Sequence, residues 1–254
     1  MHQIKCLKGL ATLSLTLLLT VASGSFSPSV RAEKPRSDTG RQGLPGRRVG
    51  GGTRGDCYLG EKTLTALIPQ NNIGLTVSAH PTFFFYVPQS SNAQLVEFVL
   101  RDENDQLVYE KQLRTNGPSG IVSFSLPEAI ASEPLKVNQK YHWYFSMICN
   151  PQNRAHDVSV DGWVQRVEPT PTLTRELEAV TLPERAALYA EAGFWHDALT
   201  TLAQLRYSRP YDWALAAQWA QLLQSVGLDE LAQEPLVNSL VSAQQQVEIP
   251  QSKR

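Results

Sequence analysis

Residues 141–149 read Tyr141-His142-Trp143-Tyr144-Phe145-Ser146-Met147-Ile148-Cys149, and this stretch carries the clearest structural signal in the chain. Successive side chains of a β-strand point to opposite faces, so alternate residues of the stretch share a face. One face then collects apolar side chains: Tyr141, Trp143, Phe145, Met147 and Cys149. His142, Tyr144 and Ser146 fall on the other face. This alternation predicts a strand that buries one face.

Six further short runs of β-forming residues flank this stretch, at 64–68, 82–87, 95–100, 107–113, 121–126 and 158–167. Turn-forming residues separate them, including Pro69-Gln70-Asn71-Asn72 and Asn116-Gly117-Pro118. Several short strands at regular spacing with turn signals between them are typical of a β-sandwich. We therefore expect residues 56–168 to form a seven-stranded β-sandwich.

The approach to the central stretch, residues 135–143, resembles the approach to the sixth strand of immunoglobulin-like and fibronectin type III domains. In those domains the hydroxyl of a tyrosine hydrogen-bonds back to the nearby backbone, and Tyr141 stands at that place. The run Pro81-Thr-Phe-Phe-Phe-Tyr86 is similar to an early strand of such domains. The resemblance implies an immunoglobulin/fibronectin-III-like sandwich, although Cys57 lies outside the expected strands.

The rest of the chain, 172–248, is rich in Ala and Leu and is expected to be helical after Pro169-Thr170-Pro171. It contains an internal repeat of 34 residues, which aligns Ala186, Tyr189, Gly193 and Ala198 with Ala220, Leu223, Gly227 and Ala232. This period is that of tetratricopeptide repeats, in which a turn joins two antiparallel helices. The overall expectation is an α+β protein, a sandwich followed by a tetratricopeptide-like helical segment.

Local signals support the helices: Thr181-Leu-Pro-Glu184 forms a capping box, and Asp212 is a candidate N-cap of a third helix. Trp195, Trp213 and Trp219 stand at helical spacing beside Ala and Leu, so core packing is expected for them. Two repeats are too few for independent stability. Either they pack against the sandwich or they recruit a partner.

The first 32 residues predict a signal peptide. Lys5 and Lys8 precede an apolar run at 10–21 that is too short to span a bilayer, and cleavage is expected after Ala32. An uncleaved membrane anchor is the alternative. We therefore expect a periplasmic or secreted protein with no transmembrane segment after cleavage.

Cleavage would also remove Cys6, leaving Cys57 and Cys149 as an even pair. In an oxidising compartment a disulfide between them is expected, with two free thiols or a metal pair as alternatives. No second cysteine stands at metal-ligand spacing from either residue.

Residues 33–55 hold seven of the 16 glycines, and six basic residues against two acidic ones, whereas 56–254 carry 14 basic and 22 acidic residues. A flexible basic glycine-rich leader is thus expected before an acidic body. A plain linker is the preferred interpretation, and contact of Arg47, Arg48 and Arg54 with an anionic partner is the sharper one. The sequence Gly50-Gly-Gly-Thr-Arg-Gly55 matches G-x-G-x-x-G but lacks the flanking strand and helix, so nucleotide binding is not expected.

Composition and motifs exclude several functional classes. With 254 residues, 42% of them hydrophobic and 19% charged, the chain can bury a core, and its net charge of -1 argues against nucleic-acid binding. No H-E-x-x-H or G-x-S-x-G motif is present, so neither a metal nor another cofactor is expected. His156-Asp157 beside Arg154 is the candidate hydrolytic cluster, interpreted as a loop feature.

Four stretches carry a resemblance to a known family: 43–57, with the sequence Gly-Leu-Pro-Gly-Arg-Arg-Val-Gly-Gly-Gly-Thr-Arg-Gly-Asp-Cys, and residues 81–88, 162–166 and 189–199. Over about residues 41–240 the chain resembles the cyanobacterial domain-of-unknown-function family numbered 928. The resemblance implies export by a cyanobacterium. It transfers no activity, because the family has none assigned.

Three functions follow as hypotheses. The first is a non-catalytic interaction or scaffold protein of the cell envelope, whose partner is another envelope protein. The second is a carbohydrate- or peptidoglycan-binding module that uses exposed aromatic residues such as Trp163 or Tyr86. The third is an enzyme, for example a hydrolase, whose site has no recognisable motif.

Overall fold

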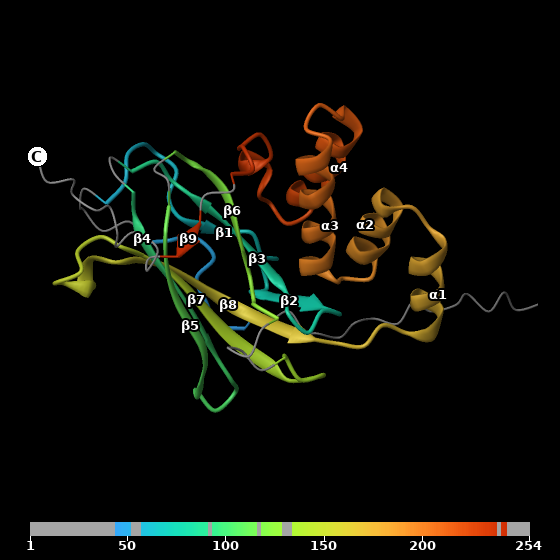
Figure 1. The fold of residues 1–254 in the computed structure, drawn as a ribbon, viewed down its shortest axis with the longest axis horizontal. Helices are drawn as coiled ribbons and strands as arrows, with labels where there is room; N and C mark the ends of the chain where they lie inside the picture. The colour runs from blue at the N-terminus through green and yellow to red at the C-terminus, as the bar shows by residue number, and fades with distance from the viewer. Residues whose placement is uncertain are drawn as a thin grey trace, which may run out of the picture. The chain divides into compact units, whose positions relative to one another are not determined.

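The computed structural model describes residues 44–51, 57–90, 93–115, 118–128, 134–237 and 240–242. It is an α+β protein in which strands β1 to β8 precede the α-helices along the chain and the short strand β9 follows them (Figure 1). The strands are β1 Thr65–Ala66, β2 Ile73–Thr76, β3 Thr82–Val87, β4 Leu95–Arg101, β5 Leu107–Arg114, β6 Gly120–Ser125, β7 Lys140–Ile148, β8 Val158–Arg166 and β9 Val241–Ser242. The helices are α1 Pro171–Ala179, α2 Leu182–Glu191, α3 Trp195–Ser208 and α4 Trp213–Gln224, with 3-10 turns at Arg154–His156 and Asp229–Leu231.

All seven strands expected from the sequence are present, as β1 and β3 to β8. They form a three-stranded sheet in the order β1-β3-β6 and a six-stranded sheet in the order β2-β8-β7-β4-β5-β9. The short strands β2 and β9 were not expected. β2 runs parallel to β8, and β9 adds only two residues to the edge of β5.

The first hydrophobic core lies between the two sheets. The alternation in β7 is confirmed, because Trp143, Phe145 and Met147 are buried in this core. From the opposite sheet Phe85 stacks on Phe145, with ring centroids 4.0 Å apart, and Phe83 lies 4.9 Å from Phe98. The hydroxyl of Tyr141 accepts a hydrogen bond from the backbone N–H of Lys136 and donates one to Oε1 of Gln139, at 3.1 Å each.

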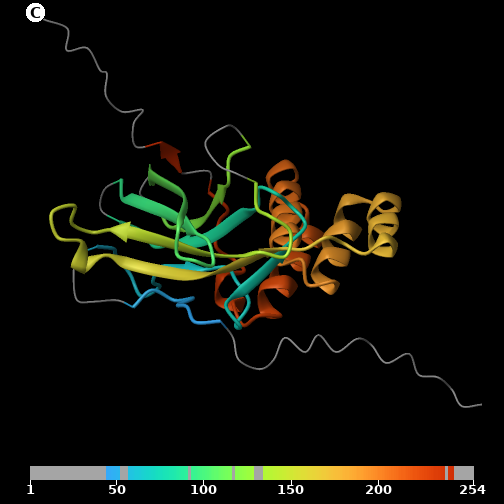
Figure 2. The same ribbon diagram turned by 90° about the horizontal axis from the view of Figure 1, so that it is seen from below.

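A second core joins the helices to the outer face of the three-stranded sheet. Strand β3 is therefore covered on both faces: Phe83 and Phe85 point into the first core, and Phe84 and Tyr86 into the second. The Phe84 ring lies 6.3 Å from that of Trp219 in α4. Of the two alternatives left by the sequence, the helical hairpins pack against the sheet, and both ribbon views show them gathered on one side of the strands (Figures 1 and 2).

The helical segment is shorter than expected. Asp212 is an N-cap as expected and accepts hydrogen bonds from the backbone N–H groups of Ala214 and Leu215. The helix that it caps is the fourth and not the third, because the chain has an additional helix, α1, which Thr170 caps. After Gln224 the chain does not remain helical to 248. Leu236 instead forms a parallel bridge with Ile121 of β6, where the free edge of the sheet offers backbone hydrogen bonds. The second repeat is thus truncated after the 3-10 turn.

The described part of the leader, 44–51, belongs to the folded body. Arg47 exchanges two backbone hydrogen bonds with Asp161, of 3.2 and 2.9 Å, and Gly50 donates one to Leu64 at 2.7 Å. These residues extend the sheet edges beside β8 and β1. The expected boundary at 55 therefore falls too late for this segment, whereas the predicted signal peptide at 1–32 lies outside the described residues.

Candidate functional site

A groove of about 400 Å³ lies between helices α2 and α4. Its apolar lining comes from Ala186, Ala187 and Ala190 of α2, Trp195 and Leu202 of α3, and Leu222 and Val226 at the end of α4. Glu191, Gln218, Gln221 and Ser225 are the polar residues of the lining. Three alanines on one side of α2 leave space where larger side chains would fill it. The arrangement can bind an apolar segment.

The groove follows from the internal repeat. Gly193 ends the α2 segment with a φ of 83°, and Gly227 follows α4 with a φ of 69°. Both angles lie in the left-handed region that glycine adopts readily, and the two residues are the pair aligned at a spacing of 34. Ala186 and Ala198, which the repeat pattern also singled out, are buried. In the structure α3 contacts both α2 and α4, and residues of all three helices line the groove.

The floor of the groove is anchored to the sheet. The indole N–H of Trp195 donates to the carbonyl of Leu67 at 2.8 Å, and both residues are buried. Trp219 is fully buried in the second core, and the guanidinium of Arg206 lies 5.2 Å from its ring centroid. Trp213, for which core packing was also expected, is instead 81% exposed. Two of the three tryptophans therefore hold the groove in place.

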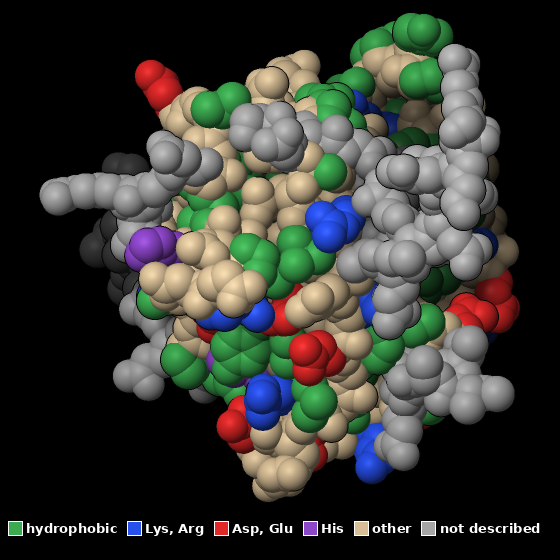
Figure 3. Space-filling model, turned by 60° about the vertical axis from the view of Figure 1, so that its left-hand side comes forward, with side chains coloured by type: hydrophobic (Ala, Val, Ile, Leu, Met, Phe, Trp, Pro, Cys, Tyr) green, Lys and Arg blue, Asp and Glu red, His purple; other side chains and the backbone are tan. Residues whose placement is uncertain are grey.

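The helical segment that forms the groove is acidic. Between residues 171 and 237 the sequence has nine acidic and four basic residues, and Glu191 is the charged residue of the groove lining. Elsewhere the charges are mixed. On the described part of the face in Figure 3, Lys and Arg side chains alternate with Asp and Glu.

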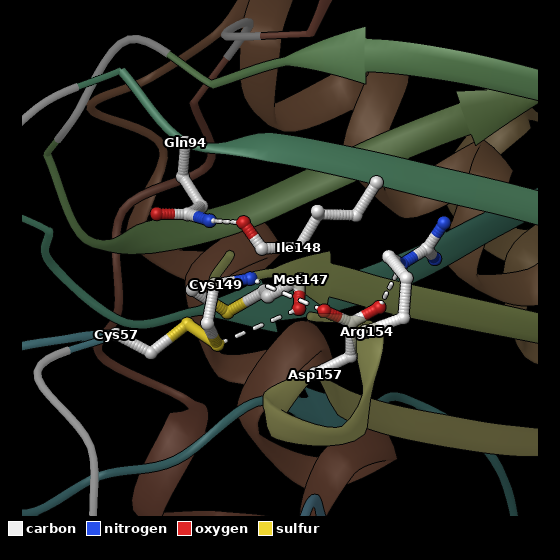
Figure 4. The surroundings of a disulfide bond; sticks show 7 residues. All are labelled: Cys57, Gln94, Met147, Ile148, Cys149, Arg154 and Asp157. Carbon is white, nitrogen blue, oxygen red and sulfur yellow. Dashed lines mark hydrogen bonds and ion pairs between the residues drawn. A yellow bond between two sulfur atoms is a disulfide. The ribbon is translucent and has the colours of Figure 1, made fainter. Parts of the chain in front are cut away.

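The predicted disulfide between Cys57 and Cys149 is present (Figure 4). The Cα atoms are 5.0 Å apart, and Cys57 is buried in the core between the sheets. Cys149 directly follows β7, and its backbone N–H donates to the carboxylate of Asp157 at 3.3 Å. The bond therefore fixes the start of the sandwich to the end of its central strand.

The three arginines proposed to contact an anionic partner do not share one environment. Arg48 donates to the carbonyls of Ile68, Val226 and Gly227, the shortest distance being 2.7 Å to Val226. It thus ties the leader to the end of α4, and burial lowers its pKa. Arg47 bonds to Asp161 through its backbone, and Arg54 lies outside the described residues.

The aromatic residues named for sugar binding do not form a stacking platform. Tyr86 is 5% exposed and belongs to the second core. Trp163 stacks on His142, with ring centroids 4.3 Å apart, and its indole N–H donates to the carbonyl of Pro45 at 2.8 Å. The exposed aromatic residues of the described chain include Tyr211 and Trp213, at the turn between α3 and α4.

The cluster at His156-Asp157 is a loop feature in the structure. Asp157 pairs with Arg154, which also donates to Glu97 at 2.8 Å, and these contacts raise the pKa of Arg154. Sequence reasoning missed a different chain of polar contacts on the outer face of the six-stranded sheet. There Tyr144 contacts His142, and His142 contacts Asp161, at 2.9 Å each. The strand alternation placed His142 and Tyr144 on this face, but only the pairing of β7 with β8 brings Asp161 to them.

Among the described residues, no group of three or more His, Cys, Asp or Glu side chains is arranged to hold a metal ion. In the same part of the chain, none of the helices has the length and apolar character of a membrane span. No curated protein matches the chain. Residues 49–236 match the family Domain of Unknown Function (DUF928), as the resemblance implied, and the chain belongs to that family.

Proposed function

We propose that the protein is a non-catalytic interaction protein of the cell envelope, and that the groove between α2 and α4 binds a segment of another envelope protein. The observation that carries this proposal is the open apolar groove on helices that are already anchored to a sheet. The helices already bury their apolar residues in the second core. Their stability therefore does not require another protein to cover the groove.

The bound segment is apolar and flanked by Lys or Arg. Apolar side chains match the alanines, Leu222 and Val226, and basic side chains complement Glu191 and the acidic excess of the helices. Interfaces of this kind commonly bury an apolar centre within a polar rim.

The finer fold assignment supports the same proposal. We propose that the two sheets form an immunoglobulin/fibronectin-III-like sandwich, because β1, β3 and β6 stand opposite β8, β7, β4 and β5, and because Tyr141 makes the corner hydrogen bond. The helices form a tetratricopeptide-like hairpin followed by a truncated second repeat. Both architectures commonly serve binding.

The cellular location is a further part of the proposal. A signal peptide at 1–32, cleaved after Ala32, and the disulfide between Cys57 and Cys149 support a periplasmic or secreted protein. The family resemblance supports a cyanobacterial source.

The test compares two synthetic peptides with equal leucine content, one flanked by Lys and the other by Glu. Binding is followed by NMR on the alanine methyl groups of the purified protein. We expect the Lys-flanked peptide to bind and to shift Ala186, Ala187 and Ala190. Ala187→Arg should weaken binding at least about tenfold, since it fills the groove and repels the peptide.

Ala217→Arg is the matched control, because Ala217 is an exposed residue of α4 that does not line the groove. It should leave binding unchanged. Equal binding of the two peptides, or equal effects of the two variants, would refute the proposal. These point variants are preferable to removal of residues 169–254, which would expose Phe84 and Tyr86.

Sugar binding is the second candidate, favoured by the exposure of Tyr211 (97%) and Trp213 (81%). If Tyr211→Ala and Trp213→Ala together abolish retention on a glycan matrix while Ala187→Arg does not, this candidate replaces the first.

A further inference from the structure

A second cavity, of about 230 Å³, lies where the loop after β2 meets helices α2 and α3. It is separate from the groove, because α2 lines it with Leu182, Arg185 and Tyr189 rather than with its alanines. Hydroxyl groups dominate the remaining lining: Thr76, Ser78, Thr82, Thr200 and Thr201. Its volume is below the usual range for drug-sized ligands, so it suits a small polar molecule.

One part of this cavity carries a carboxylate without a cationic partner. Asp197 accepts hydrogen bonds from the backbone N–H of Val77, at 3.0 Å, and from the hydroxyl of Thr76. It forms no ion pair with any described residue. Burial raises the pKa of Asp197 to about 6, and the hydrogen bonds that it accepts lower it.

Another part of the cavity carries a cation without an anionic partner. Arg185 donates through Nε to the carbonyl of Leu177 at 3.0 Å, and it too lacks an ion pair with the described residues. Both charges affect the pKa of Tyr189. Burial raises the pKa of its phenol, the charge of Asp197 raises it further, and the charge of Arg185 lowers it. The two opposite charges therefore both act on Tyr189 but do not neutralise each other.

Two imidazoles add unsatisfied polar atoms. His196 is buried, and its Nδ1 lies 3.1 Å from the carbonyl of Thr82, so Nδ1 carries the proton. Its Nε2 is buried without a hydrogen-bond partner in the described structure, and so is Nε2 of His80. Both side chains line the cavity. Both Nε2 atoms are inaccessible, and Nε2 of His196 faces Gly74 of β2, so these two atoms offer a ligand no direct contact.

We propose that this cavity binds a small zwitterion of the amino-acid or short-peptide class, with its ammonium group on Asp197 and its carboxylate on Arg185. Two opposite charges in one small cavity, neither in an ion pair with a described residue, match a ligand that carries both charges. Each contact is a charge-assisted hydrogen bond, and Arg can bind a carboxylate through two N–H groups. Such a site is independent of the groove between α2 and α4.

The test is calorimetric titration of the purified protein with glycine, glycylglycine and triglycine, and with methylamine and acetate as probes that carry one charge. We expect saturable binding of at least one of the three zwitterions, tighter than that of either single-charge probe. Asp197→Asn and Arg185→Gln should each weaken binding at least about tenfold. Binding should also weaken below pH 6, where Asp197 takes up a proton.

Arg175→Gln is the matched control, since Arg175 also donates through Nε to a carbonyl, that of Pro171, but lies outside the cavity. It should leave binding unchanged. Thr201→Leu keeps both charges and narrows the cavity, so it should abolish binding, with thermal unfolding showing that it is folded. The proposal is refuted if no zwitterion binds saturably, if methylamine or acetate binds as tightly, or if both charge variants keep the affinity.

Discussion

Replacing Asp197 by Asn should stabilise the protein at neutral pH more than at acidic pH. The carboxylate lies in the first turn of α3, where burial raises its pKa from 3.8 to about 6. The folded state therefore holds a proton more tightly than the unfolded chain does. The stability from this proton is fully present below pH 3.8 and is lost as the pH rises through 6.

The magnitude follows from the two pKa values. Their difference corresponds to at most about 3 kcal/mol at pH 7, since one pKa unit equals about 1.4 kcal/mol. Partial exposure of the side chain reduces this figure. Asn has no charge to desolvate, and its side-chain oxygen can still accept the hydrogen bond from Val77. The stability of Asp197→Asn relative to the natural protein should thus rise by up to about 3 kcal/mol between pH 4 and pH 7.

The assay is urea unfolding followed by tryptophan fluorescence at intervals from pH 4 to pH 8. Burial lowers the pKa of the neighbouring His196 to about 4, so this group costs stability as the pH falls from 6.5 to 4. Both proteins keep His196, so its contribution cancels in the difference. Glu176→Gln, an exposed residue of α1, serves as control and should show no such trend. A difference for Asp197→Asn that stays constant with pH, or falls as the pH rises, would refute the reasoning.

Three further changes test the sandwich by denaturant unfolding. Gly162→Ala should destabilise it by about 1–3 kcal/mol, because the added Cβ would lie 2.6 Å from the Trp143 ring, and an unchanged midpoint would contradict this packing. Removing the disulfide by Cys57→Ala with Cys149→Ala should cost about 2–4 kcal/mol, whereas a reducing agent should have no effect on that variant. Tyr141→Phe should cost about 1 kcal/mol through the lost hydrogen bonds to Lys136 and Gln139, and an unchanged unfolding midpoint would contradict this.

The strands of the sandwich could be predicted because apolar and polar residues alternate along them in the same way as buried and exposed side chains. In β7 every second side chain is buried, so the pattern and the burial coincide. Strand β2 could not be predicted in this way, because its four residues, Ile-Gly-Leu-Thr, include a glycine. The glycine is required by tertiary packing: a Cβ at Gly74 would lie 2.4 Å from Nε2 of His196. His196, the residue that requires a glycine at position 74, lies about 120 positions further along the sequence.

The candidate groove was only partly visible in the sequence. The spacing of Gly193 and Gly227 predicted two equivalent helix ends, and both residues have positive φ. The repeat did not predict that the second helical pair would stop after Asp229–Leu231. That outcome depends on Ile121, whose backbone exchanges hydrogen bonds with Pro235 and Val237. There the chain forms hydrogen bonds with the edge of a sheet that is distant in sequence, and these replace the hydrogen bonds of a helix. A local sequence pattern carries no information about such distant contacts.

The outer face of β3 explains how so short a helical array is stable. Repeated helical hairpins normally need at least three units, because each unit buries its apolar face only against its neighbours. Here Phe84 and Tyr86 provide an apolar surface on one side of the helices, and Trp195 and Trp219 pack on it. The sheet therefore takes the place of the missing neighbour. Helix α3 contacts both α2 and α4, and the groove that these three helices line remains open. An open groove on helices that pack against a sheet thus results from joining a truncated helical repeat to the two sheets, which is why we propose the groove, rather than the sheets, as the binding site.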